Sequence, residues 1–256
     1  MPISSPHNDR LKEIRKLARR RSREQTGRFV AEGEDLLAAA DAAGWPALER
    51  YCAAGSGLDG VEVEAELLAD VSQLGSGTRA LGVFEQRWAD APVGPLCVAL
   101  HGISDPGNVG TILRSALAFG AASVALGPDC ADPYGPKAVR ASMGALFAVP
   151  VARYAEVAKL PGTTVALDAH AEESLAELGS AGLRAADAGD PAADGSLTLL
   201  VGAERAGLPD EVLAACDRVV RIPIHSESLN AAMAATVALY EVSRGAVATD
   251  HRMPPA

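Results

Sequence analysis

Short apolar runs recur between helical patterns over residues 95–247, and they restrict the fold more than any other feature of the chain. Strands are predicted at LCVALHGI, ASVALG, TTVALDA, LTLLVGAE and RVVRIPI, and helices at VGTILRSALAF, PKAVRASMGALF and LNAAMAATVALYEVSRG. Strands that are apolar throughout are buried on both faces, which is typical of a parallel sheet covered by helices. The pattern therefore predicts an α/β domain with a mostly parallel sheet.

The N-terminal part predicts a second, smaller α/β unit. An amphipathic helix is expected to start at Leu11, with Leu11, Ile14 and Leu17 on one side. RFVAEG and ALERYCAAG follow as predicted strands, with the helix GEDLLAAADAAG between them. The polar, proline-containing stretch QRWADAPVGP is a plausible linker. We therefore expect two domains, at residues 1–88 and 95–247.

Charge is distributed unevenly along the chain. The formal net charge is -10, which taken alone argues against binding to nucleic acid. Residues 1–30, however, carry a net charge of +6, and the remaining residues carry -16. Such an asymmetry is typical of a surface that binds a polyanion, but a solvated helix face explains it equally well.

Several classes of protein are disfavoured by composition. No apolar run is long enough to span a bilayer, and the charged start MPISSPHNDRLKEIRK lacks the apolar core of a secretion signal. The four cysteines are scattered singly, without a CxxC pair or a Cys/His cluster. We therefore expect a cytoplasmic protein with no membrane association, no disulfide framework and no metal site.

The stretch DPGNVGTILRSALAFGA, residues 105–121, joins a small polar loop to a helix. Asn108 is a suitable N-cap, and the glycines allow backbone amides to approach a ligand. Arg114 lies off the apolar stripe of that helix, so it can point at a ligand or, more simply, at solvent. The spacing matches neither the GxGxxG of dinucleotide folds nor a P-loop, which disfavours a nucleotide-binding oxidoreductase.

Two later loops carry polar residues where strands end. Glu204 follows the buried strand LTLLV, at a position where α/β proteins contact ligands, although a surface turn is an equally good interpretation. Ser228 and Asn230 lie near the start of the last helix. Both residue types cap helices, and the free amides of a helix start can also bind an anion.

Taken together and in this order, these segments resemble a known family. NVGTILRSALAFGA, VGAERAGL and IPIHSESLNAAMAATVALYE are similar to the three motifs of the SpoU (TrmH-type) RNA ribose 2′-O-methyltransferases of the SPOUT superfamily. DPYGPKAVRASMGALFAVPV also resembles the family. RKLARRRSREQTGRFVAEGEDLL resembles its accessory, ribosomal-protein-like substrate-binding domain.

The resemblance implies a fold and a cofactor that the pattern of strands and helices does not. It implies a SPOUT domain whose C-terminal segment forms a trefoil knot, a rare exception to the rules of chain connection. The second and third motifs would hold S-adenosylmethionine in a bent shape. The positions that match the family's cofactor contacts are Gly202, Ile222, Leu229 and Leu167.

The resemblance also implies the catalytic residues and the partners. The matching polar positions are Asn108, Arg114, Glu204, Ser228 and Asn230. In the family two catalytic domains form a dimer with the active site at its interface, so a homodimer is expected. The substrate would be RNA, with ribosomal RNA favoured over transfer RNA. The chain departs from the family at Ala203-Glu204-Arg205, where many members have Asn-Glu-Gly, and in a shorter loop between Pro223 and Ser228.

The expected chemistry needs positioning and proton removal, because the sulfonium methyl donor is already activated. The family's proposal makes the arginine a general base. Arginine stays protonated at ordinary pH, so for Arg114 we favour binding of a substrate phosphate. The sequence leaves open the target nucleotide, the choice between housekeeping modification and antibiotic resistance, and an RNA-binding module that has lost catalysis.

Overall fold

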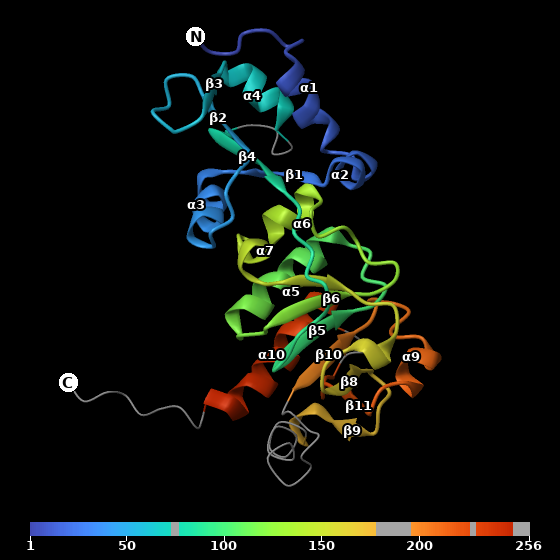
Figure 1. Ribbon diagram of the computed structural model, residues 1–256. Helices are drawn as coiled ribbons and strands as arrows, with labels where there is room; N and C mark the ends of the chain where they lie inside the picture. Colours follow the sequence, from blue (N-terminus) through green and yellow to red (C-terminus); the bar gives the residue numbers. More distant parts are fainter. Residues whose placement is uncertain (73–76, 178–195, 226–228, 248–256) are drawn as a thin grey trace, which may run out of the picture. The chain divides into compact units, whose positions relative to one another are not determined.

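The computed structural model describes residues 1–72, 77–177, 196–225 and 229–247, which gather into two compact units (Figure 1). Unit 1 comprises Met1–Arg87 and Asp132–Ala148, and unit 2 comprises Trp88–Ala131 and the described residues from Val149 onward. Among the described helices, none combines the length and apolar character needed to cross a bilayer. The division into functional domains at 1–88 and 95–247 stays a prediction.

Unit 1 is built on a four-stranded sheet in the order β1–β4–β2–β3. β4 pairs antiparallel with β1 and β2, whereas β2 and β3 are parallel. The strands are β1 (Arg28–Glu32), β2 (Glu49–Ala53), β3 (Val61–Val63) and β4 (Ala80–Glu85). The helices are α1 (Asp9–Lys16), α2 (Arg20–Thr26), α3 (Glu34–Ala42), α4 (Ala65–Val71), α6 (Pro136–Ala141) and α7 (Ala145–Ala148). The small α/β unit predicted from the sequence is present.

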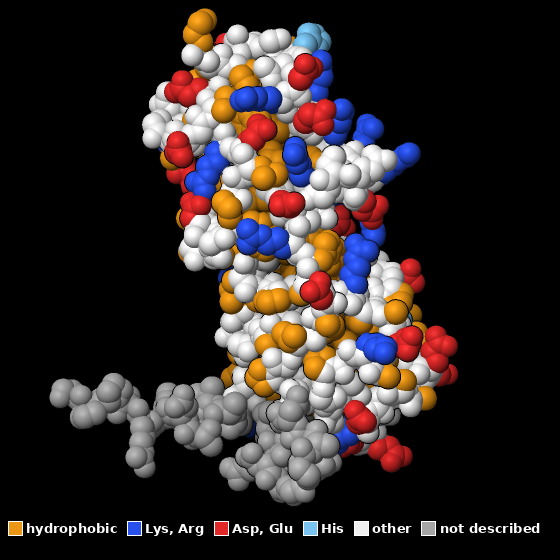
Figure 2. All heavy atoms as spheres, in the orientation of Figure 1, with side chains coloured by type: hydrophobic (Ala, Val, Ile, Leu, Met, Phe, Trp, Pro, Cys, Tyr) orange, Lys and Arg blue, Asp and Glu red, His pale blue; other side chains and the backbone are white. Residues whose placement is uncertain are grey.

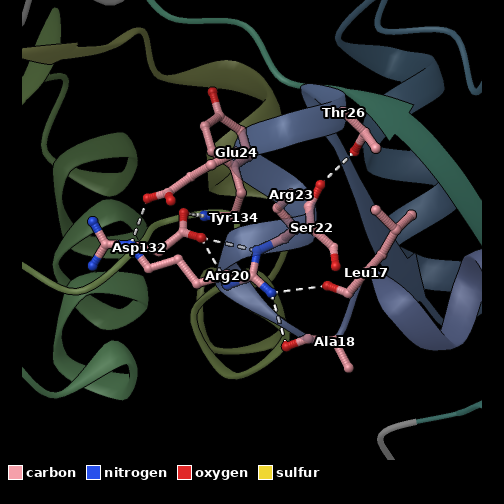
Figure 3. Close-up of polar contacts among 9 residues, drawn as sticks. All are labelled: Leu17, Ala18, Arg20, Ser22, Arg23, Glu24, Thr26, Asp132 and Tyr134. Atoms are coloured by element: carbon pink, nitrogen blue, oxygen red, sulfur yellow. Dashed lines mark hydrogen bonds and ion pairs between the residues drawn. The ribbon is translucent and has the colours of Figure 1, made fainter.

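The basic N-terminal segment folds as two helices with a break between them. The predicted apolar side is confirmed, since Leu11, Ile14 and Leu17 are buried. Backbone carbonyls at the break after α1 accept hydrogen bonds from a side chain: Nη1 of Arg23 donates to the carbonyl oxygens of Leu17 and Ala18 at 2.8 and 2.9 Å (Figure 3). These carbonyls at the break are therefore satisfied by a side chain.

The same arginine joins α2 to the segment that begins at Asp132. Its Nε and Nη2 donate to Oδ2 of Asp132 at 2.9 and 2.7 Å, and Oδ1 of Asp132 accepts from the backbone N–H of Tyr134 (Figure 3). Arg23 is only 4% exposed. An arginine is rarely so buried unless it is paired and hydrogen-bonded, as it is here.

Residues 132–148 complete unit 1 through aromatic packing. The rings of Tyr134 and Phe147 lie 4.9 and 6.0 Å from that of Phe29, between centroids, and Phe147 also contacts Phe84 and Trp45. The single helix predicted over 136–147 is wrong: α6 ends at Ala141 and α7 starts at Ala145. Met143 and Gly144 between them have φ of 49° and 90°, which no continuous helix allows.

Unit 2 contains a seven-stranded sheet in the order β7–β6–β5–β10–β8–β11–β9, and every neighbouring pair in it is parallel. The strands are β5 (Leu96–Leu100), β6 (Ser123–Leu126), β7 (Val151–Arg153), β8 (Thr163–Leu167), β9 (Glu173–Ser174), β10 (Leu197–Val201) and β11 (Arg218–Arg221). The predicted parallel sheet is confirmed. β11 is shorter than the predicted strand RVVRIPI, because pairing stops at Arg221.

Helices cover both faces of this sheet. They are α5 (Pro106–Ala118), α9 (Asp210–Ala214) and α10 (Ala231–Val247), with a 3-10 helix at Val157–Lys159. Cys97 and Leu200 face one side, where they cluster with Val157 and Val212. On the other side α5 and α10 pack together (Figure 1). The hydroxyls of Ser115 and Thr236 share a 2.7 Å hydrogen bond between these helices. Burial on both faces explains why the central strands are mostly apolar.

The loops that follow β5, β8, β10 and β11 leave the sheet at one edge, because all four strands are parallel. These loops begin at His101, Asp168, Gly202 and Ile222. A backbone hydrogen bond from His101 to Val201, 2.9 Å long, joins the ends of the central strands. Segments about 100 residues apart in sequence are thereby brought to one edge, where α/β proteins bind ligands.

Candidate functional site

The first loop ends in the N-terminus of α5. The N-cap of this helix is Asp105, whose Oδ1 accepts from the N–H groups of Gly107 and Asn108 at 2.6 and 3.1 Å. The prediction that Asn108 is the N-cap is therefore wrong, because Pro106 starts the helix and Asn108 lies in its first turn. The side chain of Asn108 is consequently free for a longer-range contact.

The second loop is a tight hairpin that displays three residues. Ala203 and Gly207 exchange two backbone hydrogen bonds of 3.1 and 2.9 Å, and Gly207 has a φ of 66°. Gly202, just before the hairpin, lies against its far side: a Cβ there would meet the carbonyl carbon of Gly207 at 2.4 Å and the nitrogen of Leu208 at 2.6 Å. Glycine at 202 is thus required for the close approach that shapes the loop.

The third loop delivers Asn230 to the start of α10. Its Oδ1 accepts from the N–H groups of Ala232 and Met233 at 3.0 and 3.3 Å, so the capping interpretation is confirmed. The amide nitrogen Nδ2 of the same side chain donates to Oε1 of Glu204 at 2.5 Å. Asn230 therefore both caps a helix and holds a carboxylate.

Glu204 is the centre of a hydrogen-bonded set drawn from all three loops. Nδ2 of Asn108 also donates to Oε1 of Glu204 at 2.5 Å, and Nδ2 of Asn230 lies 3.2 Å from Oδ1 of Asn108. We call Asn108, Glu204 and Asn230 the polar triad. The structure brings together three of the five predicted polar residues. A carboxylate with two amide donors is fixed in position, which lets it orient neighbouring groups.

A cavity of about 230 Å³ opens beside the polar triad. All four residues predicted to contact a cofactor line it, namely Leu167, Gly202, Ile222 and Leu229. Glu204 and Arg205 lie on its rim, and Ala231 and Ala234 of α10 extend its apolar wall. We call it the first cavity. It combines an apolar wall with a few polar groups, as small-molecule sites do.

A second cavity, of about 370 Å³, lies on the other side of the hairpin loop. Residues 102–105 and Asn108 form one wall, and Ala203, Glu204, Arg205 and Ala206 form the other. Residues 203–206 line both cavities, so a thin loop divides them. A group bound in one cavity would therefore lie close to a group bound in the other.

Two predicted site residues are not tested by these contacts in the same way. Arg114 lies on the exposed face of α5, lines neither cavity, and has no hydrogen bond or ion pair with the described residues. Ser228 lies outside the described residues, as does part of the loop that is shorter than in the family. Their roles stay predictions.

Sequence reasoning missed four residues of the site. Asp105 is the true cap, Asp168 and His170 line the first cavity, and Arg205 lines both. Asp168 and His170 directly follow β8, a position that predicts ligand contact in a parallel sheet. The proline after Asp105 was a further signal, because proline favours the first position of a helix.

The cysteines do not provide a nucleophile at this site. All four are free, and burial raises the pKa of the Cys97, Cys130 and Cys216 thiols. A raised pKa keeps a thiol protonated and unreactive at neutral pH. Among the described residues no three His, Cys, Asp or Glu side chains gather as metal ligands would.

Comparison with known proteins assigns the family. The sequence profile of the SpoU rRNA Methylase family matches residues 95–240, more than half of the chain. The chain belongs to the SpoU rRNA Methylase family. A profile described as an MRM3-like substrate binding domain matches residues 8–75. The resemblance drawn from the three motifs is confirmed, and the polar triad consists of one residue from each motif.

Individual SpoU relatives match over nearly the whole chain. An uncharacterized tRNA/rRNA methyltransferase of Synechocystis is 31% identical, with 94% of this chain and 93% of the relative covered. The 23S rRNA (guanosine(2553)-2′-O)-methyltransferase RlmP of Bacillus subtilis is 26% identical, with 94% and 98% covered. The AdoMet-bound rRNA methyltransferase of Sinorhizobium meliloti is 29% identical, with a TM-score of 0.80 and 95% and 97% covered.

Proposed function

We propose that the chain is an S-adenosylmethionine-dependent enzyme that methylates a ribose 2′-hydroxyl in ribosomal RNA. The observation that carries the proposal is the polar triad, which unites the three family motifs on the loop between two cavities. Relatives named as 23S rRNA 2′-O-methyltransferases and an AdoMet-bound neighbour support the same reaction. Transfer of a labelled methyl group to ribosomal RNA tests it.

The first cavity fits S-adenosylmethionine. Leu167, Ile222 and Leu229 provide an apolar surface suited to a purine ring, and Asp168 provides a carboxylate for a hydroxyl or ammonium group. A Cβ at Gly202 would meet the backbone of Gly207 and Leu208, so glycine there lets the hairpin that lines this cavity keep its position. When bound, the cofactor supplies an activated methyl group. The chain's own residues must then bind it, exclude water and position the acceptor.

The second cavity suits the target ribose, because it contains Asn108 and Glu204 and shares the hairpin wall with the first. A 2′-hydroxyl must lose its proton as it attacks, so a hydrogen-bonding frame that holds the hydroxyl toward the neighbouring cavity assists the reaction. We assign that frame to Asn108, Glu204, Asn230 and Ser228. Arg114 would bind substrate phosphate from the exposed face of α5, as a protonated guanidinium.

A homodimer is part of the proposal, and the apolar surface of α10 supports it. Met233, Val237 and Tyr240 recur along one side of α10 and are 62, 42 and 52% exposed. Leu117 of the adjoining α5, which the sequence assigned to the buried stripe, is 47% exposed. Apolar side chains gathered in this way mark a binding surface. We assign this surface to a second copy of the chain. Arg114 lies on the same helix as Leu117, so the proposed interface would lie near Arg114.

Val237→Glu tests the dimer. Sedimentation equilibrium should give twice the chain mass for the wild type, and the variant should dissociate at least about 100-fold more readily, because a symmetric interface buries the new charge twice. Leu48→Glu is the matched control, since Leu48 is also an exposed apolar residue at 48%. A monomeric wild type, or equal effects of both substitutions, would remove the dimer from the proposal.

We further propose that residues 1–88 bind RNA, that residues 95–247 form the methyltransferase domain with a trefoil knot, and that the protein works in the cytoplasm.

The basic surface of the N-terminal helices supports RNA binding by residues 1–88. Lys and Arg side chains gather over α1 and α2 (Figure 2). Residues 1–30 contain nine Lys and Arg residues, and five of them are paired with carboxylates, including Lys12 with Asp9 and Lys16 with Glu13. The others are exposed and make no ion pair with the described residues: Arg10, Arg19, Arg21 and Arg28. These four are available for phosphates.

The double change Arg19→Gln/Arg21→Gln should lower RNA affinity and flatten its salt dependence by about 1.4–1.8 in the slope of log affinity against log salt, at 0.7–0.9 per phosphate contact. The matched control is Lys12→Gln/Lys16→Gln, which removes the same charge from paired side chains. Filter-binding titrations with ribosomal RNA at several salt concentrations measure both. Equal salt slopes for the two double variants would contradict the claim that the arginines without an ion pair, and not the paired lysines, bind RNA phosphates.

A further inference from the structure

Arg205 lines the two cavities of the proposed reaction, and the proposed function does not use it. It lies at the tip of the hairpin closed by Ala203 and Gly207, directly after Glu204 of the polar triad. It lines both cavities, and no Lys and no other Arg lines either one among the described residues. Its side chain is exposed and has no hydrogen bond or ion pair with the part of the chain that the structure describes.

The other charged groups around the second cavity are already engaged. Asp105 accepts two backbone N–H groups as the cap of α5. Glu204 accepts from Asn108 and Asn230. Arg205 is therefore the charged group on this wall that remains available for a ligand. Because two carboxylates line the same cavity, a polyanion needs a cation there to approach.

We propose that Arg205 binds the phosphodiester carried by the 3′ carbon of the target ribose; this inference rests on the proposed function. The 2′ and 3′ carbons of a ribose are bonded to each other. A cavity that presents a 2′-hydroxyl to the polar triad therefore also holds the 3′ phosphate near its wall. The guanidinium fork can donate two parallel hydrogen bonds to phosphate oxygens, which fixes the direction of the nucleotide as well as binding it.

The alternative is that Arg205 contacts S-adenosylmethionine in the first cavity. The charges of the two ligands favour contact with RNA in the second cavity. S-adenosylmethionine carries a sulfonium and an ammonium against one carboxylate, so its net charge is positive and a nearby guanidinium repels it overall. A phosphodiester is a pure anion with oxygens on its exposed side. Arg205 also differs from Arg114 in lining the second cavity, which Arg114 does not. The two arginines therefore make separate contacts with RNA.

The test compares the wild type with Arg205→Gln and Arg205→Lys, and with Lys159→Gln as the matched control. Lys159 is exposed, belongs to the same unit and lines neither cavity. Calorimetry gives the affinity for S-adenosylmethionine. Single-turnover transfer to 23S ribosomal RNA from cells that lack the gene, at several salt concentrations, gives the half-saturating RNA concentration and its salt slope.

Arg205→Gln should raise the half-saturating RNA concentration at least about tenfold and flatten the salt slope by about 0.7–0.9, the value for one phosphate. Arg205→Lys should restore the slope and only part of the affinity, because it keeps the charge and loses the fork. Cofactor affinity should stay within about twofold, and Lys159→Gln should behave as the wild type. Unchanged RNA saturation and slope, or weakened cofactor binding, would overturn the inference. Absence of methyl transfer by the wild type would overturn the proposed function, and this inference with it.

Discussion

Gly202→Ala should weaken S-adenosylmethionine binding by roughly 5- to 150-fold, since overpacking costs about 1–3 kcal/mol and 1.4 kcal/mol is tenfold in affinity. The added Cβ would lie 2.4 Å from the carbonyl carbon of Gly207 and 2.6 Å from its oxygen. These are backbone atoms, which cannot rotate away as a side chain can. The hairpin must therefore move from the end of β10, and it forms a wall of both cavities.

Gly120→Ala is the matched control for this substitution. It lies in the same unit, and its Cβ meets nothing within 4 Å, so the cost is limited to the strain of its φ of 73°. Calorimetric titration with S-adenosylmethionine measures affinity, and a thermal melt checks that each variant is folded. Equal cofactor affinity for Gly202→Ala and the wild type would argue that the first cavity is not the cofactor site.

Arg23→Met should lower the free energy of unfolding of unit 1 by about 3–5 kcal/mol, the cost of removing one partner from a buried ion pair. The side chains of Arg23 and Asp132 are 5 and 13% exposed, so water does little to screen the charge left behind. The substitution also removes the donor to the carbonyls of Leu17 and Ala18. The exposed pair of Arg20 and Glu24 provides the contrast, and Arg20→Gln should cost less than about 1 kcal/mol.

A double-mutant cycle separates the ion pair from packing. Asp132→Asn removes the charge and keeps the oxygen that accepts from Tyr134. Combined with Arg23→Met, it should cost less than the sum of the two single changes, because no unpaired charge stays buried. Trp45 packs in unit 1, so its fluorescence in a Trp88→Phe background reports urea unfolding of this unit. Additive costs would mean that the two side chains act independently.

Local apolar patterns predicted five of the seven described strands of unit 2, because burial on both faces leaves a continuous signal in sequence. The short edge strands β7 and β9 were not predicted. β5 is apolar throughout, β8 and β10 are apolar except for threonines, and all three lie within the sheet interior. The resemblance to the family motifs then predicted residues of the first cavity. Gly202, Ile222 and Leu229 belong to loops that follow parallel strands, so they meet at one edge of the sheet. In a parallel sheet, residues that directly follow different strands lie close together at the same edge.

Features set by distant contacts could not be predicted in this way. The helix over 136–147 breaks at Met143 because Gly144 approaches α3 so closely that a Cβ would lie 2.5 Å from Ala39. Leu117 fits the apolar stripe of α5 by spacing, yet it is exposed beside the apolar side of α10. Arg205 was noted only as a departure from the family, because its place between two cavities depends on the fold of the hairpin.

The most direct measurement is transfer of tritium from [methyl-³H]S-adenosylmethionine to ribosomal RNA from cells that lack the gene, followed by nuclease digestion and identification of the labelled nucleotide. We expect a single 2′-O-methylated ribose. Because Arg114 lines neither cavity, we also expect Arg114→Ala to bind the cofactor normally and to transfer at least about tenfold more slowly, the effect of one charge-assisted hydrogen bond. Label on a base, or a wild-type protein that binds the cofactor and RNA without labelling any ribose, would contradict the proposed function.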